Sequence, residues 1–333
     1  MTDRFLVMGN KKLVDKYGRH IDYLRISVTD RCNFRCFYCM PEEGIQLLPK
    51  KDILSYDEIS TVAECAVKTG INKFRITGGE PLVRRGIIGF LGRLAKLPGV
   101  KKVSLTTNGL LLEKYYKDLN KAGIDSINIS LNSLNNSTFC RLTRTNAFNK
   151  VKRGINLLLK SGFRNIKINT VIMRGFNDNE VPDFVAMTIE NPIAVRFIEH
   201  MPCGKWTSDL LGQIVKAGDI LDVIRKSGNI APEKKKLGSG PARYYRIKGA
   251  KGFIGFISPV SKPFCSECNR LRLTADGYLK SCLLSNKIVD LKPLIRGKGF
   301  FPNAIKDAFT KAASLKPRVH CFEELTNMSR IGG

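Results

Sequence analysis

Long hydrophobic runs are missing from this sequence. The longest charge-poor apolar stretches are only of strand length, so no segment is expected to span a bilayer. The first ten residues carry Asp3 and lack a continuous apolar stretch, which argues against a secretory signal. Asp15 and Asp22 also fit poorly with an acid-free transit peptide. We therefore expect a cytoplasmic protein, and an apolar share of 43% is sufficient for a sizeable core.

Acidic residues are scarce as well. Only 29 Asp and Glu stand against 56 Lys and Arg, which gives a formal charge of +27. An excess of this size is compatible with a nucleotide, a nucleic acid or an anionic membrane as partner. The basic residues are scattered, however, and their longest run is Lys234-Lys235-Lys236, whereas a nucleic-acid arm is more often a block of about five or six. The charge alone is therefore no evidence for a nucleic-acid binder.

Histidine is rare, with three residues, while there are ten cysteines. Because the cytosol keeps thiols reduced, a disulfide framework is not expected. Six cysteines fall into two spaced triplets. The other four are isolated and are predicted to be small buried hydrophobes: Cys65, Cys140, Cys203 and Cys321.

Short apolar segments alternate with amphipathic ones along the first two thirds of the chain. The predicted strands are Tyr23–Val28, Lys73–Thr77, Lys102–Thr106, Ser126–Leu131, Ile166–Ile172 and Ala194–Ile198. The predicted helices are Tyr56–Thr69, Ile87–Leu97, Leu111–Ala122, Asn149–Ser161, Glu180–Glu190 and, later, Ala217–Ser227. Several of these helices are followed by glycine, the residue expected just past a helix C-terminus: Gly70, Gly99, Gly123 and Gly162. Six β-then-α units predict a parallel sheet with right-handed crossovers.

Polar residues stand at the positions predicted to be the exits of five strands. They are Thr77 to Glu80, Thr106 to Gly109, Ser130 with Asn132, Lys167 with Asn169, and Arg196 with Glu199. In (β/α) barrels the reacting groups gather at the C-terminal ends of the strands. The pattern therefore predicts an α/β fold with a partial (β/α)6 TIM-like barrel over residues 1–215. Beyond it, residues 216–333 are predicted to form a C-terminal α+β extension, Gly-rich in part, that carries the second cysteine triplet.

The first triplet, Cys32, Cys36 and Cys39, directly follows the first predicted strand. Cysteines separated by three and then two residues can hold an iron–sulfur cluster from one loop. A [4Fe–4S] cube usually takes four thiolates, so three leave one iron open to an external ligand. A closed zinc site needs a fourth Cys or His, and the nearest histidine, His20, precedes the strand. The spacing favours the cluster over zinc and over free thiols.

The second triplet consists of Cys265, Cys268 and Cys282. A zinc ribbon would show two Cys-x2-Cys pairs, and only one is present here. Structural zinc stays open as an alternative, since His320 or Cys321 could supply a fourth ligand. A second [4Fe–4S] cluster with an open iron explains three ligands without a fourth.

The Cys-x3-Cys-x2-Cys loop with an aromatic before its last cysteine, together with the turn Gly78-Gly79-Glu80-Pro81, resembles the radical S-adenosylmethionine (SAM) superfamily. The resemblance implies that SAM chelates the open iron and is cleaved to a 5'-deoxyadenosyl radical. It also implies four SAM contacts: Tyr38, Gly79, Ser130 and Met201. One departure lies nearby, because Asn132 stands where that pattern usually has Asp. Asn keeps the size and the acceptor capacity.

From Leu24-Arg25-Ile26-Ser27 through Cys265–Leu283 to the final Gly332-Gly333, the chain resembles the GTP 3',8-cyclase family of molybdenum cofactor biosynthesis. That resemblance implies that a second [4Fe–4S] cluster holds guanine, that the radical removes H3', and that C3' then attacks guanine C8. The implied GTP-binding residues are Arg25, Lys73, Arg75, Thr106, Lys167, Arg196, Arg270, Arg272 and Thr274. The terminal Gly332 and Gly333 would reach into the active site as catalytic residues.

The same resemblance implies partners: the enzyme cyclic pyranopterin monophosphate synthase downstream and a flavodoxin- or ferredoxin-like reductant, with no membrane and with a homodimer left open. Two other hypotheses are compatible with parts of the sequence. A radical SAM enzyme acting on RNA or a peptide would also suit the high isoelectric point of about 9.8. A basic RNA-binding protein with two zinc sites would leave the strand-exit residues without a purpose.

Overall fold

The computed structural model describes residues 12–201, 210, 212–234, 237–297, 301–320 and 331–332. Its six predicted strands are confirmed, and each pairs in parallel with the next along the chain. They are β1 (Tyr23–Ser27), β2 (Lys73–Thr77), β3 (Lys102–Thr107), β4 (Ser126–Ser130), β5 (Ile166–Ile172) and β6 (Ala194–Glu199). Side chains along these strands alternate, with buried apolar residues such as Phe74 and Ile127 toward the helices. The polar residues between them therefore face the inside of the curved sheet.

The predicted helices are confirmed to within one residue at each end. They are α1 (Tyr56–Lys68), α2 (Ile87–Lys96), α3 (Leu112–Lys121), α5 (Phe148–Lys160), α6 (Val181–Glu190) and α7 (Ala217–Ser227). Local chemistry sets their limits. Ser55 and Glu58 form a capping box at the start of α1, and Gly70, with φ of 96°, follows its end. Short 3-10 turns cover Lys50–Asp52, Pro81–Val83, Asp178–Glu180 and Cys265–Glu267.

The sequence pattern missed one helix of the barrel, α4 (Asn136–Thr143). Asn135 caps it by accepting a hydrogen bond from the Thr138 amide at 3.1 Å, and Arg144 ends it in the left-handed conformation with φ of 53°. An eight-residue helix gives only two turns of apolar periodicity, which is too short a signal to separate from a loop.

The C-terminal part extends the same sheet at both edges. Strand β9 (Phe253–Ile257) pairs in parallel with β6, and β10 (Arg270–Leu273) pairs in parallel with β1. Antiparallel strands continue each edge: β8 (Arg243–Ile247) and β7 (Ile230–Glu233) on one side, β11 (Tyr278–Lys280) and β12 (Ile288–Asp290) on the other. The strand order is β12-β11-β10-β1-β2-β3-β4-β5-β6-β9-β8-β7. The predicted partial barrel is confirmed, and its extension is built into the same sheet.

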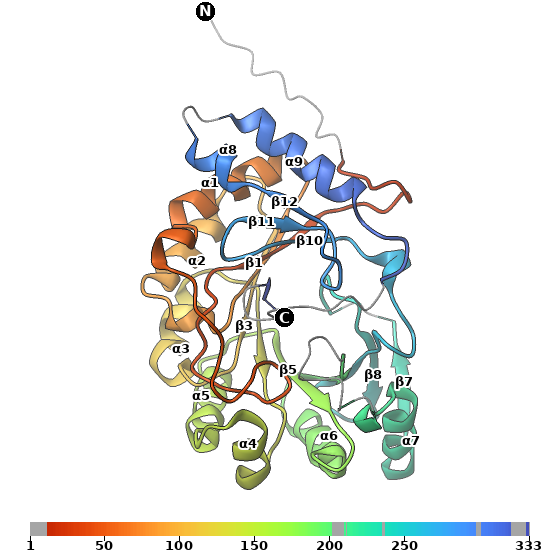
Figure 1. Ribbon diagram of the computed structural model, residues 1–333. Helices are drawn as coiled ribbons and strands as arrows, with labels where there is room; N and C mark the ends of the chain where they lie inside the picture. Colours follow the sequence, from red (N-terminus) through yellow and green to blue (C-terminus); the bar gives the residue numbers. More distant parts are fainter. Residues whose placement is uncertain are drawn as a thin grey trace, which may run out of the picture.

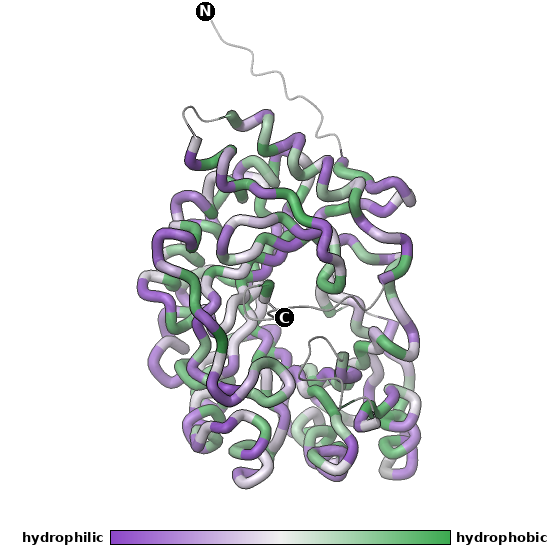
Figure 2. The backbone as a smooth tube through the Cα atoms, in the orientation of Figure 1, coloured by the Kyte–Doolittle hydropathy of each residue, from purple (hydrophilic) through white to green (hydrophobic). Residues whose placement is uncertain are grey.

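Two further helices, α8 (Lys292–Arg296) and α9 (Pro302–Ser314), lie next to α1 beyond the β10 edge (Figure 1). The other helices surround the outside of the curved sheet, and the C-terminal end lies within its curve (Figure 1). These outer helices alternate between hydrophilic and hydrophobic residues along the chain (Figure 2), as expected where one face packs on a sheet and the other meets water. None of the described helices is long and apolar enough to cross a membrane.

Candidate active site

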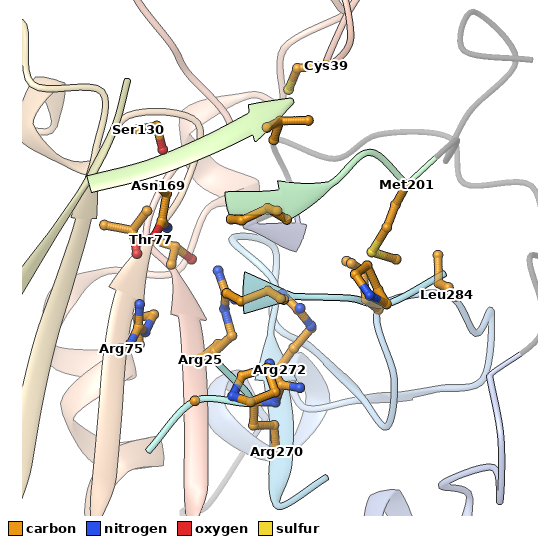
Figure 3. Close-up of a pocket in the computed structure, with 18 of the residues that line it drawn as sticks. Arg25, Cys39, Arg75, Thr77, Ser130, Asn169, Met201, Arg270, Arg272 and Leu284 are labelled. Carbon is orange, nitrogen blue, oxygen red and sulfur yellow. The ribbon is translucent and has the colours of Figure 1, made fainter. Parts of the chain in front are cut away.

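A pocket of about 400 Å³ opens inside the curve of the sheet. Residues from both cysteine triplets line it: Cys32, Cys36, Cys39, Cys265, Cys268 and Cys282. In the close-up, Arg25, Arg270 and Arg272 gather at one end of the pocket, whereas Cys39 lies at the other (Figure 3). Segments more than 200 residues apart in the sequence thus contribute cysteines to one cavity.

The first triplet sits on a loop that is held by the turn after β2. The Gly79 amide donates to the Thr29 carbonyl at 2.7 Å, and the Glu80 amide donates to the Arg31 carbonyl at 2.8 Å. A Cβ at Gly79 would lie 2.3 Å from the Arg31 carbonyl oxygen, so only glycine fits this approach. The glycine turn therefore fixes the start of the cysteine loop through main-chain contacts.

Glu80 ties this turn to the end of β3. Its buried carboxylate accepts hydrogen bonds from Thr107 Oγ1 at 2.8 Å and from the Asn108 amide at 2.6 Å. Burial raises the pKa of Glu80 to about 7, against the lowering effect of these hydrogen bonds. Asn108 in turn donates from Nδ2 to Asn33 Oδ1 at 2.7 Å, and the same nitrogen lies 3.9 Å from Cys32 Sγ. Polar contacts thus connect the end of β3 to the first cysteine.

The unpredicted helix α4 supports the other side of the cysteine loop. The Arg35 and Phe37 amides donate to the Thr143 and Leu142 carbonyls at 3.1 and 3.2 Å. Phe34 is buried and packs edge-on against Phe139, with ring centroids 5.8 Å apart. The loop is therefore fixed by its neighbours on both sides.

The three thiols of this loop fit an iron–sulfur cluster. Burial raises the pKa of Cys32, of Cys36 and of Cys39, the last to about 12, and the neighbouring thiols raise the pKa values of Cys36 and Cys39 further. Three thiols on one short loop that disfavour the thiolate form need a positively charged centre to become ligands. Iron supplies that charge, and a donor set of three cysteines leaves one iron for an external ligand.

The second triplet lies in more cationic surroundings. Burial opposes ionisation of Cys268, but the charges of Arg270 and Lys316 outweigh it and lower the pKa of this thiol to about 6. Cys265 Sγ lies 3.0 Å from Nδ1 of His320. Among the described residues, no three His, Cys, Asp or Glu side chains converge closely enough to hold one metal ion. These thiols and cations could hold a second, negatively charged cluster.

Arginines line the pocket across three neighbouring strands. Arg272 on β10 pairs in register with Arg25 on β1, and Arg25 pairs with Arg75 on β2. Burial and the neighbouring guanidinium groups lower the pKa of Arg25, and burial and Arg270 lower that of Arg272 to about 10. Bringing like charges together at a buried site costs free energy unless an anion joins them. This arginine row, defined as Arg25, Arg75 and Arg272, is therefore suited to phosphate.

Arg196 and Lys167 add positive charge on the β5–β6 side. Burial lowers the pKa of Arg196 to about 10, and burial with the charges of Arg196 and Arg75 lowers that of Lys167 to about 7. Glu199 is the only carboxylate among the described residues that line the pocket, and it accepts hydrogen bonds from the Ala217, Val260 and Ser261 amides. Its charge is thus already engaged by the backbone.

Several buried polar atoms of the pocket have no hydrogen-bond partner within the described part of the chain. They are Thr106 Oγ1, Asn169 Oδ1, Arg196 Nε and His200 Nε2. Because buried polar groups are nearly always paired in folded proteins, these atoms indicate that the pocket takes a polar ligand.

The four predicted SAM contacts line this pocket: Tyr38, Gly79, Ser130 and Met201. Asn132, the departure from the usual Asp, donates from Nδ2 to the Tyr38 hydroxyl and accepts from the Val171 amide at 2.9 Å. An Asp carboxylate has no N–H donor, so the hydrogen bond that Asn132 donates to the Tyr38 hydroxyl depends on the amide.

Three predicted GTP-binding residues are not among the residues that line the pocket. Lys73 forms an ion pair with Asp22 at 2.5 Å. Thr274 donates to Asp276 at 2.5 Å and accepts from the Tyr278 amide in the turn before β11. Lys167 points from β5 into the barrel beside Arg196 without being among the lining residues.

The C-terminal glycine Gly332 does reach the barrel. Its carbonyl accepts a hydrogen bond from Arg272 Nη1 at 2.7 Å, and a Cβ there would lie 2.0 Å from Thr77 Oγ1. With φ of 73°, this position also favours glycine conformationally. Gly333 lies outside the described residues, as do Cys203 and Cys321.

Three site residues were missed by sequence reasoning. Tyr23 accepts a hydrogen bond from Arg75 Nε, and Asn128 accepts one from Arg196. Tyr23 lies two residues from Arg25, and Asn128 two residues from Ser130, so the strand alternation could have placed both on the inner face of the sheet. Lys316, buried beside the second triplet, gave no such signal. Of the isolated cysteines, Cys65 is buried as predicted. The prediction for Cys140 was wrong: it is only half-buried, because it lies on the outer side of the short helix α4.

Residues 26–188 match the family model of the radical SAM superfamily, and residues 193–322 match that of Molybdenum Cofactor Synthesis C. The fold agrees: the crystal structure of Streptococcus suis SuiB bound to S-adenosylmethionine superposes with a TM-score of 0.59 at 15% identity, over 86% of this chain and 68% of that one. The barrel and its first cysteine triplet thus define a radical SAM enzyme, a class that uses a [4Fe–4S] cluster and SAM.

Two curated relatives narrow the class. The GTP 3',8-cyclase of Pelotomaculum thermopropionicum is 46% identical over 96% of this chain and 99% of its own length. The GTP 3',8-cyclase of Peptoclostridium acidaminophilum is 47% identical over 98% of this chain and its own full length. The chain belongs to the GTP 3',8-cyclase family.

Proposed function

We propose that this chain converts GTP to (8S)-3',8-cyclo-7,8-dihydroguanosine 5'-triphosphate in molybdenum cofactor biosynthesis. The observation that carries the proposal is that one pocket is lined by both cysteine triplets and by the arginine row. A radical enzyme acting on a nucleotide needs its cofactor, the base and the phosphates in one enclosed space, and this pocket has groups suited to each.

The first triplet would hold the [4Fe–4S] cluster, and Tyr38, Gly79, Ser130 and Met201 would hold SAM. When bound, cluster and SAM supply a 5'-deoxyadenosyl radical that can take a hydrogen atom. The lining of the barrel would keep water away from that radical, since Phe34, Met40 and Ile198 all face the pocket.

The second triplet would hold a second [4Fe–4S] cluster beside the guanine base. The arginine row, with Arg196, Arg270 and Lys167, would bind the triphosphate through charge-assisted hydrogen bonds. Thr106 Oγ1 and Asn169 Oδ1, buried without a protein partner in the described chain, are available to the ribose and the base. Lys73 and Thr274 would act from outside the pocket lining, through Asp22 and the turn before β11.

Gly332 would complete the site. Its carbonyl engages Arg272, so the C-terminal end and the phosphate-binding charges share one guanidinium. We infer that the terminal Gly332-Gly333 segment orients Arg272 and closes the pocket around the substrate. A cyclic pyranopterin monophosphate synthase would take up the product, and a flavodoxin- or ferredoxin-like protein would supply electrons in the cytoplasm.

Incubation with GTP, SAM and a strong reductant without oxygen tests this proposal. One hydrogen leaves C3', and one electron and one proton return to the purine, so the expected product has the mass of GTP but a different chromatographic retention. Release of 5'-deoxyadenosine should depend on GTP. Unchanged GTP, with colourless protein or about four irons or fewer per chain, would contradict the proposal. Release of 5'-deoxyadenosine triggered by RNA or a peptide in place of GTP would identify another substrate class.

A further inference from the structure

The segment that follows helix α9, residues 316–320, runs across the second cysteine triplet and contacts it at several points. We call it the C-terminal strap. His320 Nδ1 lies 3.0 Å from Cys265 Sγ at one end of this strap. At the other end is Lys316, whose side chain is almost completely buried, with 2% exposed.

Lys316 joins the two halves of the triplet. Its Nζ donates to the Arg270 carbonyl at 2.8 Å, two residues after Cys268, and to the Ser281 carbonyl at 2.9 Å, one residue before Cys282. The same ammonium hydrogen-bonds the Cys268 thiol. All three donors of the ammonium are therefore directed at the segments that carry two of the cysteines.

Two residues near the start of the described chain, Asp15 and Arg19, hold the strap in place. Arg19 donates from Nη2 to the Pro317 carbonyl at 2.7 Å and from Nη1 to the Cys265 carbonyl at 2.7 Å. Asp15 holds this guanidinium in a buried ion pair at 2.5 Å. Cys265, the cysteine that Lys316 does not reach, is thus connected to the same strap through Arg19.

We propose that Lys316 is a positioning residue for the second triplet, which holds Cys268 and Cys282 in place and supplies a fixed positive charge beside the cluster that they bind. The inference rests on the proposed function, because it requires an iron–sulfur cluster at this triplet. Nothing in that function assigns a role to Lys316, which contacts main chain and a thiol and borders the pocket with only 2% of its surface exposed.

A buried charge has two separable consequences. Its hydrogen bonds to the Arg270 and Ser281 carbonyls set the distance between the cysteine-bearing segments, which affects how firmly iron is retained. Its charge stabilises the more negative, reduced state of the cluster, which raises the reduction potential. A residue with only a structural role would change the first of these without the second.

The test uses the full chain with Cys32, Cys36 and Cys39 replaced by Ala, reconstituted with iron and sulfide without oxygen, so that only the second triplet can bind iron. This parent should hold about four irons. Adding Lys316→Met should lower both the iron content and the reduction potential of the remaining cluster. Less iron with an unchanged potential would contradict the role of the charge. Lys316→Gln keeps a donor but not the charge, and it should retain more iron than Lys316→Met with a similarly lowered potential. Lys316→Arg should restore both values toward those of the parent.

Lys311→Met is the matched control, because Lys311 lies exposed on α9, five residues before Lys316. If Lys316→Met does not fold, as judged by circular dichroism, Lys316→Gln is compared with the Lys311→Met control instead. Iron content and potential equal to those of the Lys311→Met chain would overturn the role of Lys316 and leave the cluster standing. A parent that binds zinc, or no metal, would overturn the second cluster and this inference together.

Discussion

The two cysteine triplets line the same pocket but lie in different surroundings. Cys32, Cys36 and Cys39 come from one short loop that is fixed by main-chain contacts to the glycine turn and to α4. In the second triplet, Cys265 and Cys268 precede β10, Cys282 follows β11, and the C-terminal strap contacts them. Burial raises the thiol pKa values of the first triplet, whereas Arg270 and Lys316 lower that of Cys268 to about 6.

Under the proposed function, this difference would let one barrel hold two clusters with separate tasks. At the first site burial dominates the thiol pKa values, and the charge of Arg35 opposes it at Cys32. The second site shares its cations with the side of the pocket proposed to bind phosphate, because Arg270 acts on Cys268 and lies two residues from Arg272 on the same strand face. Under the proposed function, substrate and second cluster would therefore be electrostatically coupled through Arg270.

Removing each triplet in turn should give the largest effects. Replacing Cys32, Cys36 and Cys39 by Ala should abolish 5'-deoxyadenosine formation, because no iron remains to hold SAM. Replacing Cys265, Cys268 and Cys282 by Ala should leave SAM cleavage measurable and abolish the cyclised nucleotide. Chromatography of both products, with iron analysis, makes the comparison. Cyclised product from the chain without the second triplet would show that this triplet is dispensable.

The arginine row is the next test. Arg75→Met should weaken GTP binding by about 10- to 100-fold, since a hydrogen bond to a charged group contributes about 1.5–3 kcal/mol. Iron content should stay unchanged, because Arg75 lies on β2, away from both triplets in sequence. Equilibrium dialysis with GTP measures the affinity.

Arg153→Met is the matched control for that substitution. The Arg153 side chain is 57% exposed on α5 and forms only a surface ion pair with Glu113, at 3.5 Å. Equal GTP affinities for the Arg75→Met and Arg153→Met chains would remove the arginine row from the binding site.

Gly332→Ala should lower turnover by up to about tenfold while both clusters stay loaded. The added Cβ would lie 2.0 Å from Thr77 Oγ1, and a left-handed backbone costs a non-glycine residue about 1 kcal/mol or more. Both effects displace the carbonyl that Arg272 binds. Steady-state kinetics with iron analysis tests this expectation. Thr77→Ala in the same chain should recover part of the loss, and full activity of Gly332→Ala alone would separate this segment from catalysis.

The smallest effect concerns pH. Burial, with Arg196, Arg75 and Lys102 against the weaker opposing charge of Asp125, lowers the pKa of Lys167 to about 7 from 10.5. Between these values the unfolded chain binds more protons than the folded one, so the stability of the nucleotide-free protein should rise with pH across this window. GTP should raise the pKa of Lys167 again, and binding at pH 8 should then take up as much as about one proton.

Calorimetry at pH 8 in two buffers of different ionisation enthalpy measures that uptake. Protonation of GTP itself contributes equally to every chain, so the difference between the native chain and Lys167→Met isolates the lysine. Identical proton uptake by both chains would show that Lys167 does not face the triphosphate.

Much of the barrel could be predicted from the sequence because its signals are local. Period-two alternation along β1 to β6 and glycines such as Gly70 after the helices each depend on a few neighbouring residues. The first cysteine loop was predictable for the same reason. Most of the strand-exit residues were also placed correctly, since parallel strands bring their C-terminal ends to one side of the sheet. Lys167 and Arg196 instead lie in the first half of β5 and of β6.

What the sequence could not predict depends on contacts between distant segments. The parallel pairing of β9 with β6 and of β10 with β1 needs the sheet edges to be present before those strands dock. Lys316 resembled any other lysine among 56 basic residues until its contacts with Arg270 and Ser281 were known. The ion pair of Lys73 with Asp22 likewise followed from the register of β1 and β2.

We propose that this pocket presents the ribose C3' of GTP to a radical formed at the first cluster. GTP carrying deuterium at C3', incubated without oxygen with the loaded enzyme, SAM and reductant, tests this step. We expect 5'-deoxyadenosine that contains one deuterium and a cyclised nucleotide that has lost it. Unlabelled 5'-deoxyadenosine formed alongside GTP that keeps its deuterium would show that the radical does not act at C3'.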